Sequence, residues 1–593
     1  MKKFFRSKSI IHCSLFIVLL LGALFRFYGL NWDQGYHLHP DERMIIMVAE
    51  KLRLPRPLKL SSLLDPNSPL NPKFFAYGNF PLYLLKATSS VTSQLLGQKW
   101  TTYSHLNIVG RVLSVIFDLG TIFLIFKIGE KIFSPKVAVL ASFFYTICVY
   151  PIQLSHFYAV DIPLNFFILL TLYRLISFYE KQSLKEAVFV GISLGLALAS
   201  KVSATVLVVS IGTALIFDHL LILFKRWRVA FLPWWRKILF FIFRSKKKRF
   251  FVGVIKSLLG YGLTIFLSTI ITFTIFQPYA LIDFPTFWQQ ISEQNRMTKD
   301  AFVFPYTLQY VDTPPYLYHL KNLWLWGMGI GLGTLSVVGA GVYMFNLLKR
   351  VKTRGEEDIE AKEIILVVFF LAYFLTVGRF AVKFMRYLLP LYPLFCLFAA
   401  WLLQLLIGSQ KKRISLAGKV SLIFAISTSL LWLFAFISIY SKPNTRVLAT
   451  QWINQNVPFE SKIAIEHWDD RVPMWGNYQF LEMPMYEPDT SKQKWEKVSF
   501  NLEETNYIVI ASNRLYAPLL KLADCRKYKV CYPKTAEYYR KLFDEQLGFE
   551  KVAEFTSFPK LEIGNWKLEI DDSSADEIFT VYDHPKVIVF KKK

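Results

Sequence analysis

The feature that most constrains the fold of this chain is a series of apolar runs, each about 20 residues long. A helix of that length crosses a hydrocarbon core of roughly 30 Å and satisfies its own backbone hydrogen bonds in lipid. The runs therefore predict a polytopic α-helical membrane protein with about eleven transmembrane helices. They lie near residues 10–30, 106–128, 137–152, 161–178, 186–200, 202–224, 251–277, 322–347, 363–379, 387–407 and 417–439.

The composition agrees with a membrane protein. Of 593 residues, 53% are hydrophobic and 17% aromatic, which is too apolar for a soluble chain that must cover itself with polar groups. The first run lacks a small-residue cleavage site and is followed by many others. We therefore predict a retained helix here and not a removable signal peptide.

The net charge of +26 comes from Lys and Arg residues whose positions indicate the membrane topology. Lys and Arg gather in short loops between apolar runs and not on one soluble face, so nucleic acid is not the predicted partner. The positive-inside rule places the N-terminus and these loops in the cytoplasm. The longest of them, from Lys225 to Arg249, contains no acid and is interleaved with aromatic residues, which favours an interfacial helix on anionic lipid. The loops are those at Lys131 and Lys136, Lys181 and Lys185, Lys225 to Arg249, Lys349 to Lys362, and Lys411 to Arg413.

The same alternation divides the chain into two parts. Residues 1–440 form the transmembrane module, with a long first outer loop at 31–104, and residues 441–593 form an extracytoplasmic α/β domain. In that domain Cys525 and Cys531 are either bridged or unlinked, and their spacing has no metal-site signature. Predicted strands lie at 462–468, 507–512, 579–582 and 587–590, with a helix at 536–547.

Two adjacent carboxylates, Asp41 and Glu42, follow the first span. Such a pair can take a proton from an acceptor hydroxyl as it attacks an anomeric carbon. The alternative is that both acids cap a helix beginning at Arg43.

A further acid, Asp161, lies at the outer end of the fourth span. Ionisable groups at membrane depth are costly and are functional candidates, although Asp161 could equally be the N-cap of the helix that follows. Arg111 and Asp118 lie two turns apart in the second span, and we interpret them as a structural ion pair.

Cations gather in the outer turn that contains Lys383 and Arg386, on the side where the charge bias predicts few. A lipid phosphate is a natural partner, because Arg binds phosphate oxygens in a bidentate manner and Lys adds a point charge. Lys201, at the outer end of the fifth span, would reach the same leaflet. The alternative for all three is contact with ordinary lipid headgroups.

These residues give the sequence its resemblance to a known family. It resembles the bacterial branch of the dolichyl-phosphate-mannose protein mannosyltransferases, within the GT-C superfamily of membrane glycosyltransferases. The order of the motifs over nearly the whole chain, together with the topology, carries the resemblance. The motifs are Asp41-Glu42, Tyr77 to Tyr83, Ser155-His156-Phe157 with Asp161, Gly195 to Lys201, and Lys383 with Arg386 to Pro390.

The resemblance implies an inverting glycosyltransferase of the hexosyl or mannosyl type. Its donor would be a polyprenyl-phosphate-linked sugar in a bilayer, and its location the bacterial plasma (inner) membrane. No cofactor is implied, and the displacement would be metal-independent or weakly metal-dependent. Asp41 would be the base, supported by Glu42, with Asp161 shaping the site. Lys201, Lys383 and Arg386 would bind the donor phosphate, and His39, Tyr77, His156 and Tyr387 would line the substrate site.

The acceptor remains open among protein, lipid and glycan. Related aminoarabinose transferases carry Lys where this chain has Asn79, and Lys73 is not aligned with it, which argues against lipid A as acceptor. The segment from Glu466 to Asp470 could cover the site or select acceptors, or simply end a strand. Two alternative functions stay open: a flippase for a lipid-linked glycan, and a polymerase or ligase that uses an oligosaccharide on a diphosphate.

Overall fold

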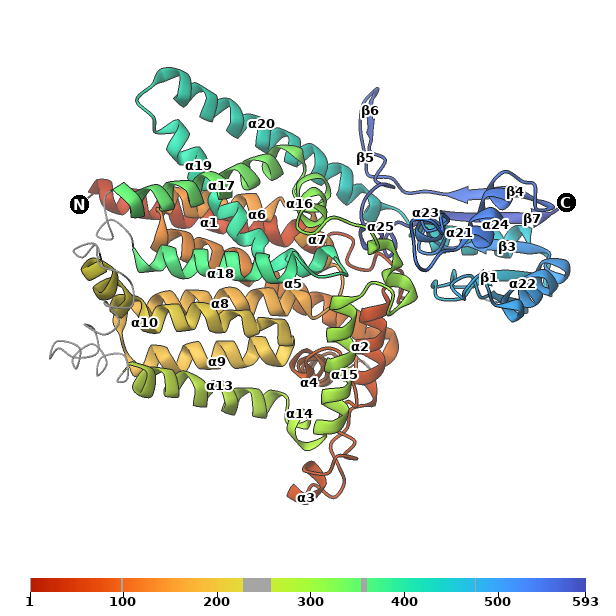
Figure 1. The fold of residues 1–593 in the computed structure, drawn as a ribbon, viewed down its shortest axis with the longest axis horizontal. Coiled ribbons are helices and arrows are strands. Elements are labelled where there is room, and N and C mark those ends of the chain that lie inside the picture. The colour runs from red at the N-terminus through yellow and green to blue at the C-terminus, as the bar shows by residue number, and fades with distance from the viewer. Residues whose placement is uncertain (1, 98–99, 228–256, 354–359, 475) are drawn as a thin grey trace.

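The structure is a computed structural model that describes residues 2–97, 100–227, 257–353, 360–474 and 476–593. A helical bundle and a smaller sheet-containing domain lie at opposite ends of the long axis (Figure 1). The N-terminus is at the far end of the bundle and the C-terminus is at the far end of the sheet domain (Figure 1). The predicted fold class, a helical membrane protein with a C-terminal sheet-containing domain, is confirmed.

The bundle helices follow the predicted apolar runs. Seven described helices are long and apolar enough to cross a membrane, or eight if the bent pair α6 and α7 is one span. The predicted count of about eleven is not confirmed, because runs such as α9 and α18 form helices of 17 residues. The bounds are α1 Lys2–Phe27, α5 Tyr103–Ile132, α6 Pro135–Thr146, α7 Val149–Ser155, α8 Asp161–Lys181, α9 Leu184–Ser200, α10 Leu207–Trp227, α13 Leu263–Phe276, α17 Ile330–Thr353, α18 Ala361–Val377, α19 Tyr392–Ile407 and α20 Lys412–Ile437.

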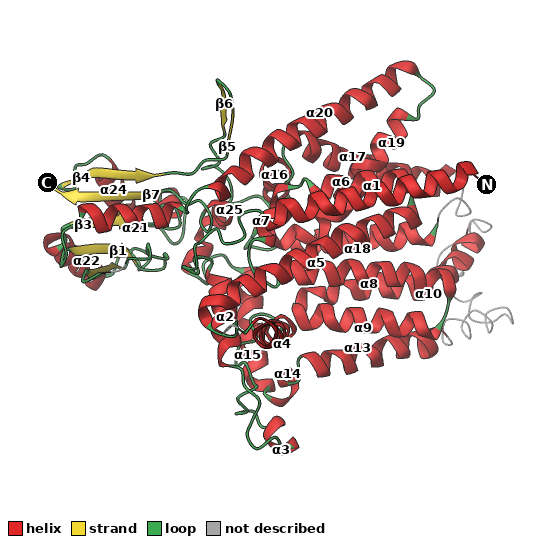
Figure 2. Ribbon diagram, turned by 180° about the vertical axis from the view of Figure 1, so that it is seen from behind, coloured by secondary structure: helices red, strands yellow, loops and turns green. Residues whose placement is uncertain are grey.

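Shorter helices form a layer between the bundle and the sheet domain. Seen from behind, α2, α4 and α15 cover the end of the bundle that faces the sheet (Figure 2). These helices are α2 Pro40–Lys51, α3 Leu60–Leu63, α4 Asn79–Leu96, α14 Tyr279–Ile282, α15 Phe284–Lys299 and α16 Leu317–Asn322. Short 3-10 and π segments join the rest: η1 Val202–Val206, η2 Leu258–Gly262, η3 Pro305–Tyr310, η4 Leu323–Gly327, η6 Met385–Leu391 and η7 Ser438–Ser441.

The C-terminal domain is built on a five-stranded sheet with the order β2-β1-β3-β7-β4. β1 is parallel to both β2 and β3, whereas β7 is antiparallel to β3 and β4. The strands are β1 Lys462–Glu466, β2 Gln479–Met483, β3 Tyr507–Ile510, β4 Phe549–Phe555 and β7 Val587–Lys592, with a separate pair β5 Lys560–Ile563 and β6 Trp566–Glu569. The helices are α21 Thr445–Asn456, α22 Lys492–Glu504, α23 Tyr516–Lys521 and α24 Pro533–Phe543. Cys525 and Cys531 form a disulfide.

One predicted strand is wrong. Residues 579–582 belong to a helical turn, α25 Glu577–Thr580, and to the turn after it. Asp576 caps this helix by accepting a hydrogen bond from the Ile578 N–H. Phe579 packs on the bundle, with its ring centroid 5.4 Å from that of Phe436. The apolar run 579–582, predicted as a strand, instead lies in and after α25, between the sheet domain and the bundle (Figure 1).

Most of the predicted basic loop from Lys225 to Arg249 lies outside the described residues, which stop at 227 and resume at 257. Its interfacial placement stays a prediction.

Candidate active site

Asp41 and Glu42 lie in the first turn of α2 but point in different directions. The N-cap of this helix is His39, whose ring Nδ1 accepts from the Glu42 N–H at 3.2 Å, and Pro40 occupies the first turn. Proline is favoured there because its missing N–H would be unpaired in any case. The predicted capping role of Asp41 is therefore filled by His39, and the Asp41 side chain is available for other contacts.

Glu42 is fully buried against the bundle. Its two oxygens accept hydrogen bonds from Nε and Nη2 of Arg111 at 3.0 and 2.6 Å, and one also accepts from the Tyr158 N–H at 2.8 Å. Asp33 completes the cluster with bonds to Arg111 of 3.0 and 2.7 Å. The cluster fixes α2 to α5.

The predicted ion pair between Arg111 and Asp118 is wrong. Arg111 binds Asp33 and Glu42, whereas Asp118 pairs with Arg26 of α1 at 2.5 Å and accepts from the Tyr145 hydroxyl at 2.7 Å. Each charge instead finds a partner on another segment, because contacts across the bundle compete with those along one helix.

Asp41 faces a cavity of about 250 Å³ between the bundle and the C-terminal domain. Elements from distant parts of the sequence meet there, and both the bundle and the C-terminal domain supply walls. The lining residues are Pro40, Asp41, Ala76, Tyr77, Lys201, Gln294, Met297, Tyr306, Phe384, Arg386, Tyr387, Trp468, Arg514, Glu577, Ile578 and Tyr582.

Two ion pairs lie side by side at this cavity. The Arg386 guanidinium bonds Asp41, and Lys201 Nζ lies 2.7 Å from Asp161 Oδ1. The pairs are joined, since Arg386 Nε is 4.0 Å from Asp161 Oδ2. Among the described residues that Nε has no hydrogen-bond partner, although it is buried. A buried donor without an acceptor is costly, so this atom is well suited to an oxygen of a bound anion.

The charge state of Asp41 follows from these neighbours. Burial opposes ionisation, but the positive charge of Arg386, with hydrogen bonds from Arg386 and Tyr77, outweighs it and holds the pKa of Asp41 well below its usual range. Burial and the nearby Asp41 charge raise the pKa of Tyr77, which stays protonated and donates to that carboxylate. Asp41 is therefore ionised and already holds a hydrogen bond from a hydroxyl group.

A close backbone contact fixes the two sides of the cavity. Lys201 is the C-cap of α9, and the Gly78 N–H donates to the Ser200 carbonyl at 3.0 Å. A Cβ at Gly78 would lie 2.0 Å from the Ala199 carbonyl oxygen, so this position requires glycine. The contact holds Tyr77 beside the end of α9. The Lys201 ammonium also lies 5.1 Å from the centre of the Tyr387 ring.

Five of the predicted site residues do not line the cavity. Asp161 reaches it only through its ion pairs with Lys201 and Arg386, and the other four lie elsewhere. Glu42 is in the Arg111 cluster. Lys383 is buried, and its ammonium donates to the Ala381 carbonyl at 3.1 Å. His39 packs between Phe157 and Tyr582, and burial lowers its pKa to about 4. His156 stacks on Tyr440 with ring centres 4.0 Å apart. None of the four lines the cavity.

The sequence interpretation missed the residues that the C-terminal domain adds to the cavity, among them Trp468, Arg514, Glu577 and Tyr582. They lie more than 400 residues after Asp41. One signal was available, the polar segment from Glu466 to Asp470 directly after the first strand of the domain.

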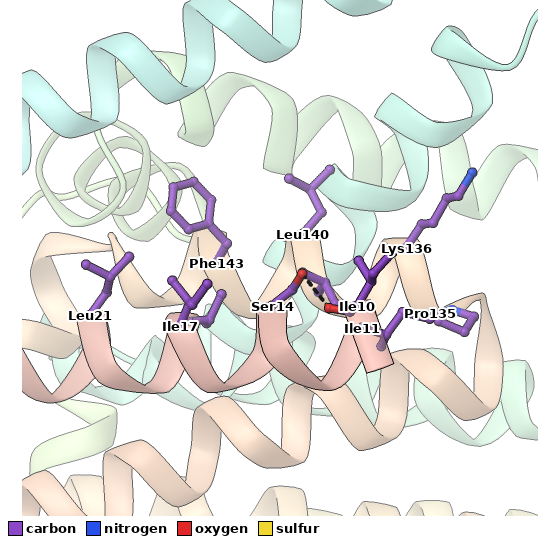
Figure 3. A pocket seen from close by; sticks show the side chains of 11 residues that line it. Ile10, Ile11, Ser14, Ile17, Leu21, Pro135, Lys136, Leu140 and Phe143 are labelled. Carbon is purple, nitrogen blue, oxygen red and sulfur yellow. Dashed lines mark hydrogen bonds between the residues drawn. The ribbon is translucent and has the colours of Figure 1, made fainter. Parts of the chain in front are cut away.

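A larger cavity, of about 720 Å³, lies between α1 and α6 (Figure 3). Its walls are mostly Ile, Leu, Val and Phe side chains, and the hydroxyl of Ser14 is engaged with the Ile10 carbonyl at 2.9 Å. Lys136 is its one charged residue. Chemistry on a polar substrate needs convergent polar groups, so the smaller cavity at Asp41 is the candidate active site.

Comparisons with known proteins agree with this architecture. A family model described as dolichyl-phosphate-mannose-protein mannosyltransferase matches residues 104–246, a segment that includes Asp161 and Lys201. No curated protein matches the sequence.

Among solved structures, the chain is similar to the apo oligosaccharyltransferase of Archaeoglobus fulgidus, with a TM-score of 0.50 and 14% identity over 86% of this chain and 71% of that one. AglB, an archaeal oligosaccharyltransferase from the same organism, in complex with an inhibitory peptide and a dolichol-phosphate, gives 0.50 and 14% over 87% and 71%. ArnT from Cupriavidus metallidurans bound to undecaprenyl phosphate gives 0.43 and 10% over 86% and 95%. The family match covers one segment of the chain, and the oligosaccharyltransferase structures share its overall fold.

Proposed function

We propose that the chain transfers a monosaccharide from a polyprenyl-phosphate carrier to an acceptor outside the cytoplasm. One observation carries this proposal: Asp41, Lys201 and Arg386 come from distant parts of the sequence and line one cavity, and Asp161 joins the two cations behind it. Carboxylates there can take a proton, and cations there can hold a phosphate.

Arg386 and Lys201 bind the donor phosphate. The unpartnered Nε of Arg386 is an available donor, and Arg favours planar bidentate contact with phosphate oxygens. A dolichol-phosphate is bound in the AglB structure that shares the fold, which supports a polyprenyl phosphate as the carrier.

Asp41 is the general base. In the donor-free site Arg386 holds Asp41 ionised but weakly basic. When a phosphate takes over part of the Arg386 guanidinium, Asp41 loses stabilisation of its charge, its pKa rises, and it becomes a better base. Donor binding thus prepares the base for the acceptor.

The transfer is a single displacement. Asp41 takes the proton from an acceptor hydroxyl while that oxygen forms a bond to the anomeric carbon. The bond from this carbon to the phosphate oxygen breaks, and its electron pair leaves with the polyprenyl phosphate. Arg386 and Lys201 stabilise the charge that develops on the phosphate, and such fixed charges in a site with little water are an effective source of catalysis.

The orientation belongs to the same proposal. The α5–α6 and α8–α9 turns, two of the loops predicted to be cytoplasmic, lie at the end of the bundle away from the sheet domain (Figure 1), so the cavity and the C-terminal domain face outward from a plasma membrane. The acceptor is a protein, lipid or glycan hydroxyl that reaches the cavity from that side.

The test compares two donor classes on the purified chain in vesicles. One is a labelled polyprenyl-phosphate hexose, and the other is an oligosaccharide on a polyprenyl diphosphate. We expect release or transfer of the hexose from the monophosphate alone. Turnover of the diphosphate donor alone would make the chain a polymerase or ligase, and movement of intact labelled lipid across the bilayer without sugar release would make it a flippase.

A further inference from the structure

The C-terminal domain presents a particular edge of its sheet to the cavity. Trp468 follows β1 and Arg514 follows β3, and these strands are parallel neighbours. Open α/β sheets bind ligands at the carboxyl ends of their parallel strands. Both side chains line the cavity that contains Asp41. The carboxyl ends of β1 and β3, the edge at which such sheets bind ligands, therefore face the cavity that contains Asp41.

Trp468 combines an exposed aromatic side chain with a strained backbone. It is 47% exposed, and its backbone φ of 78° lies in the left-handed region that costs free energy for a residue with a large side chain. Backbone strain of this kind gathers at binding and catalytic sites. Its ring centre is 6.5 Å from that of Tyr306, which stacks in turn on Phe304 at 5.5 Å. Trp468 and Tyr306 line the cavity, and with Phe304 they form an aromatic strip that begins at its wall.

Arg514 adds polar contacts next to the strip. Its side chain is 11% exposed, and Nε lies 2.7 Å from Glu577 Oε1. The other Glu577 oxygen accepts from the Gln309 amide at 2.5 Å. Within the described part of the chain, no other side-chain nitrogen of Arg514 has a hydrogen-bond acceptor. Its two terminal nitrogens remain available to acceptors on a ligand.

We infer that Trp468, Tyr306 and Arg514 form a saccharide-binding subsite, an inference that rests on the proposed function. A pyranose ring has an apolar face that packs on aromatic rings and a rim of hydroxyls that a guanidinium can contact, and this wall offers both. The ring belongs to the donor hexose or to a glycan acceptor. The chemistry is the same in both cases, and the two sources are separated by experiment.

The experiment measures binding to the full chain in nanodiscs with three probes: a polyprenyl-phosphate hexose, the bare polyprenyl phosphate, and a methyl hexopyranoside added with the bare carrier present. Trp468→Ala should weaken binding of a sugar-bearing probe about fivefold, the size of one aromatic packing contact, and leave the bare carrier unchanged. Trp468→Phe should recover most of that loss. Arg514→Met should weaken the same probe as Trp468→Ala.

Loss for the polyprenyl-phosphate hexose assigns the subsite to the donor sugar, and loss for the methyl hexopyranoside assigns it to a glycan acceptor. Trp566→Ala is the matched control, because Trp566 is 48% exposed in the same domain and does not line the cavity. Arg526→Met, at a residue 93% exposed, controls for the lost charge. Unchanged binding of every sugar-bearing probe in Trp468→Ala and Arg514→Met overturns the inference. If the wild-type chain fails to bind the bare carrier, the proposed function fails independently.

Discussion

Two charge networks begin at neighbouring residues of α2 and differ in almost every other respect. The network of Glu42 with Arg111 and Asp33 is fully buried, and each of its side chains is 0% exposed. The network of Asp41 with Arg386, Asp161 and Lys201 is 5 to 19% exposed and borders a cavity. The first leaves no carboxylate oxygen of Glu42 unpaired, whereas the second leaves Arg386 Nε without a partner.

This difference suits the Glu42 network to stabilising the fold and the Asp41 network to binding a ligand. A buried charge whose partners are complete cannot exchange them without a large cost, so the Glu42 network holds α2 in place. A network with a free donor and an adjoining space can accept an anion. One turn of helix therefore supplies a structural anchor, Glu42, and the proposed general base, Asp41, and single substitutions should affect one without the other.

The largest effect is expected for Asp41→Asn. Loss of a general base slows a reaction by about 10²- to 10⁴-fold, so transfer from the labelled polyprenyl-phosphate hexose should fall by at least about 100-fold. The thermal unfolding midpoint should stay near that of the wild type. Asp571→Asn, an exposed carboxylate in the C-terminal domain, serves as the control. Transfer at the wild-type rate in Asp41→Asn would remove Asp41 from the chemistry.

Glu42→Gln should have the opposite effect from Asp41→Asn, with stability reduced and activity largely kept. Removing one partner of a buried ion pair costs about 3–5 kcal/mol, so the free energy of unfolding should drop while the folded fraction keeps most of its turnover. Thermal unfolding followed in detergent, with activity normalised to folded protein, measures both. A stable variant that is inactive would place Glu42 among the reacting groups and erase the contrast between the two networks.

Arg386→Met should change both the rate and its pH dependence. Loss of a group that stabilises developing charge costs about 10²-fold or more. In the wild type, Arg386 lowers the pKa of Asp41, so the acid side of the kcat/KM profile should lie below the ordinary carboxyl value of about 4. Without Arg386 burial dominates, the pKa of Asp41 rises, and that side of the profile should move toward neutral pH. A profile that does not move would mean that another group titrates.

The smallest effect is expected for Tyr77→Phe. The substitution removes one hydrogen bond to Asp41 and leaves the ring in place. Such a bond to a charged group is worth about 1.5–3 kcal/mol when it is lost outright, but the remaining pair with Arg386 should keep the loss of kcat/KM near tenfold or below. Tyr83→Phe is the control, since the Tyr83 hydroxyl bonds the Leu70 carbonyl and does not line the cavity. Equal losses in both variants would point to a general packing effect.

Much of the fold followed from the sequence because lipid imposes a strong pattern. The apolar runs give the bundle. Asp41 and Asp161 were singled out as acids at the outer ends of spans, and Lys201 and Arg386 as cations on the same side, and the structure joins these four side chains by ion pairs. Ion-pair partners on different helices could not be predicted from the sequence. Nothing in the spacing of Arg111 and Asp118 shows that each has a partner on another segment.

The C-terminal part was harder to predict for a physical reason. Four or five apolar residues in a row fit a buried strand and a buried helical turn equally well. At residues 579–582 the deciding factor is the aromatic surface of the bundle against which Phe579 packs, including Trp432 at 6.3 Å between ring centres. That surface comes from helices over 100 residues earlier, so no local pattern could show it.

The position of α25 also determines when, during synthesis, the cavity at Asp41 can be completed. A ribosome makes Asp41 and Asp161 early, whereas Glu577 and Tyr582, which border the same cavity, come more than 400 residues later. The membrane helices can be inserted well before that point, yet the cavity then lacks a wall. Synthesis itself therefore delays completion of the cavity until residues 577–582 have been made and folded against the bundle.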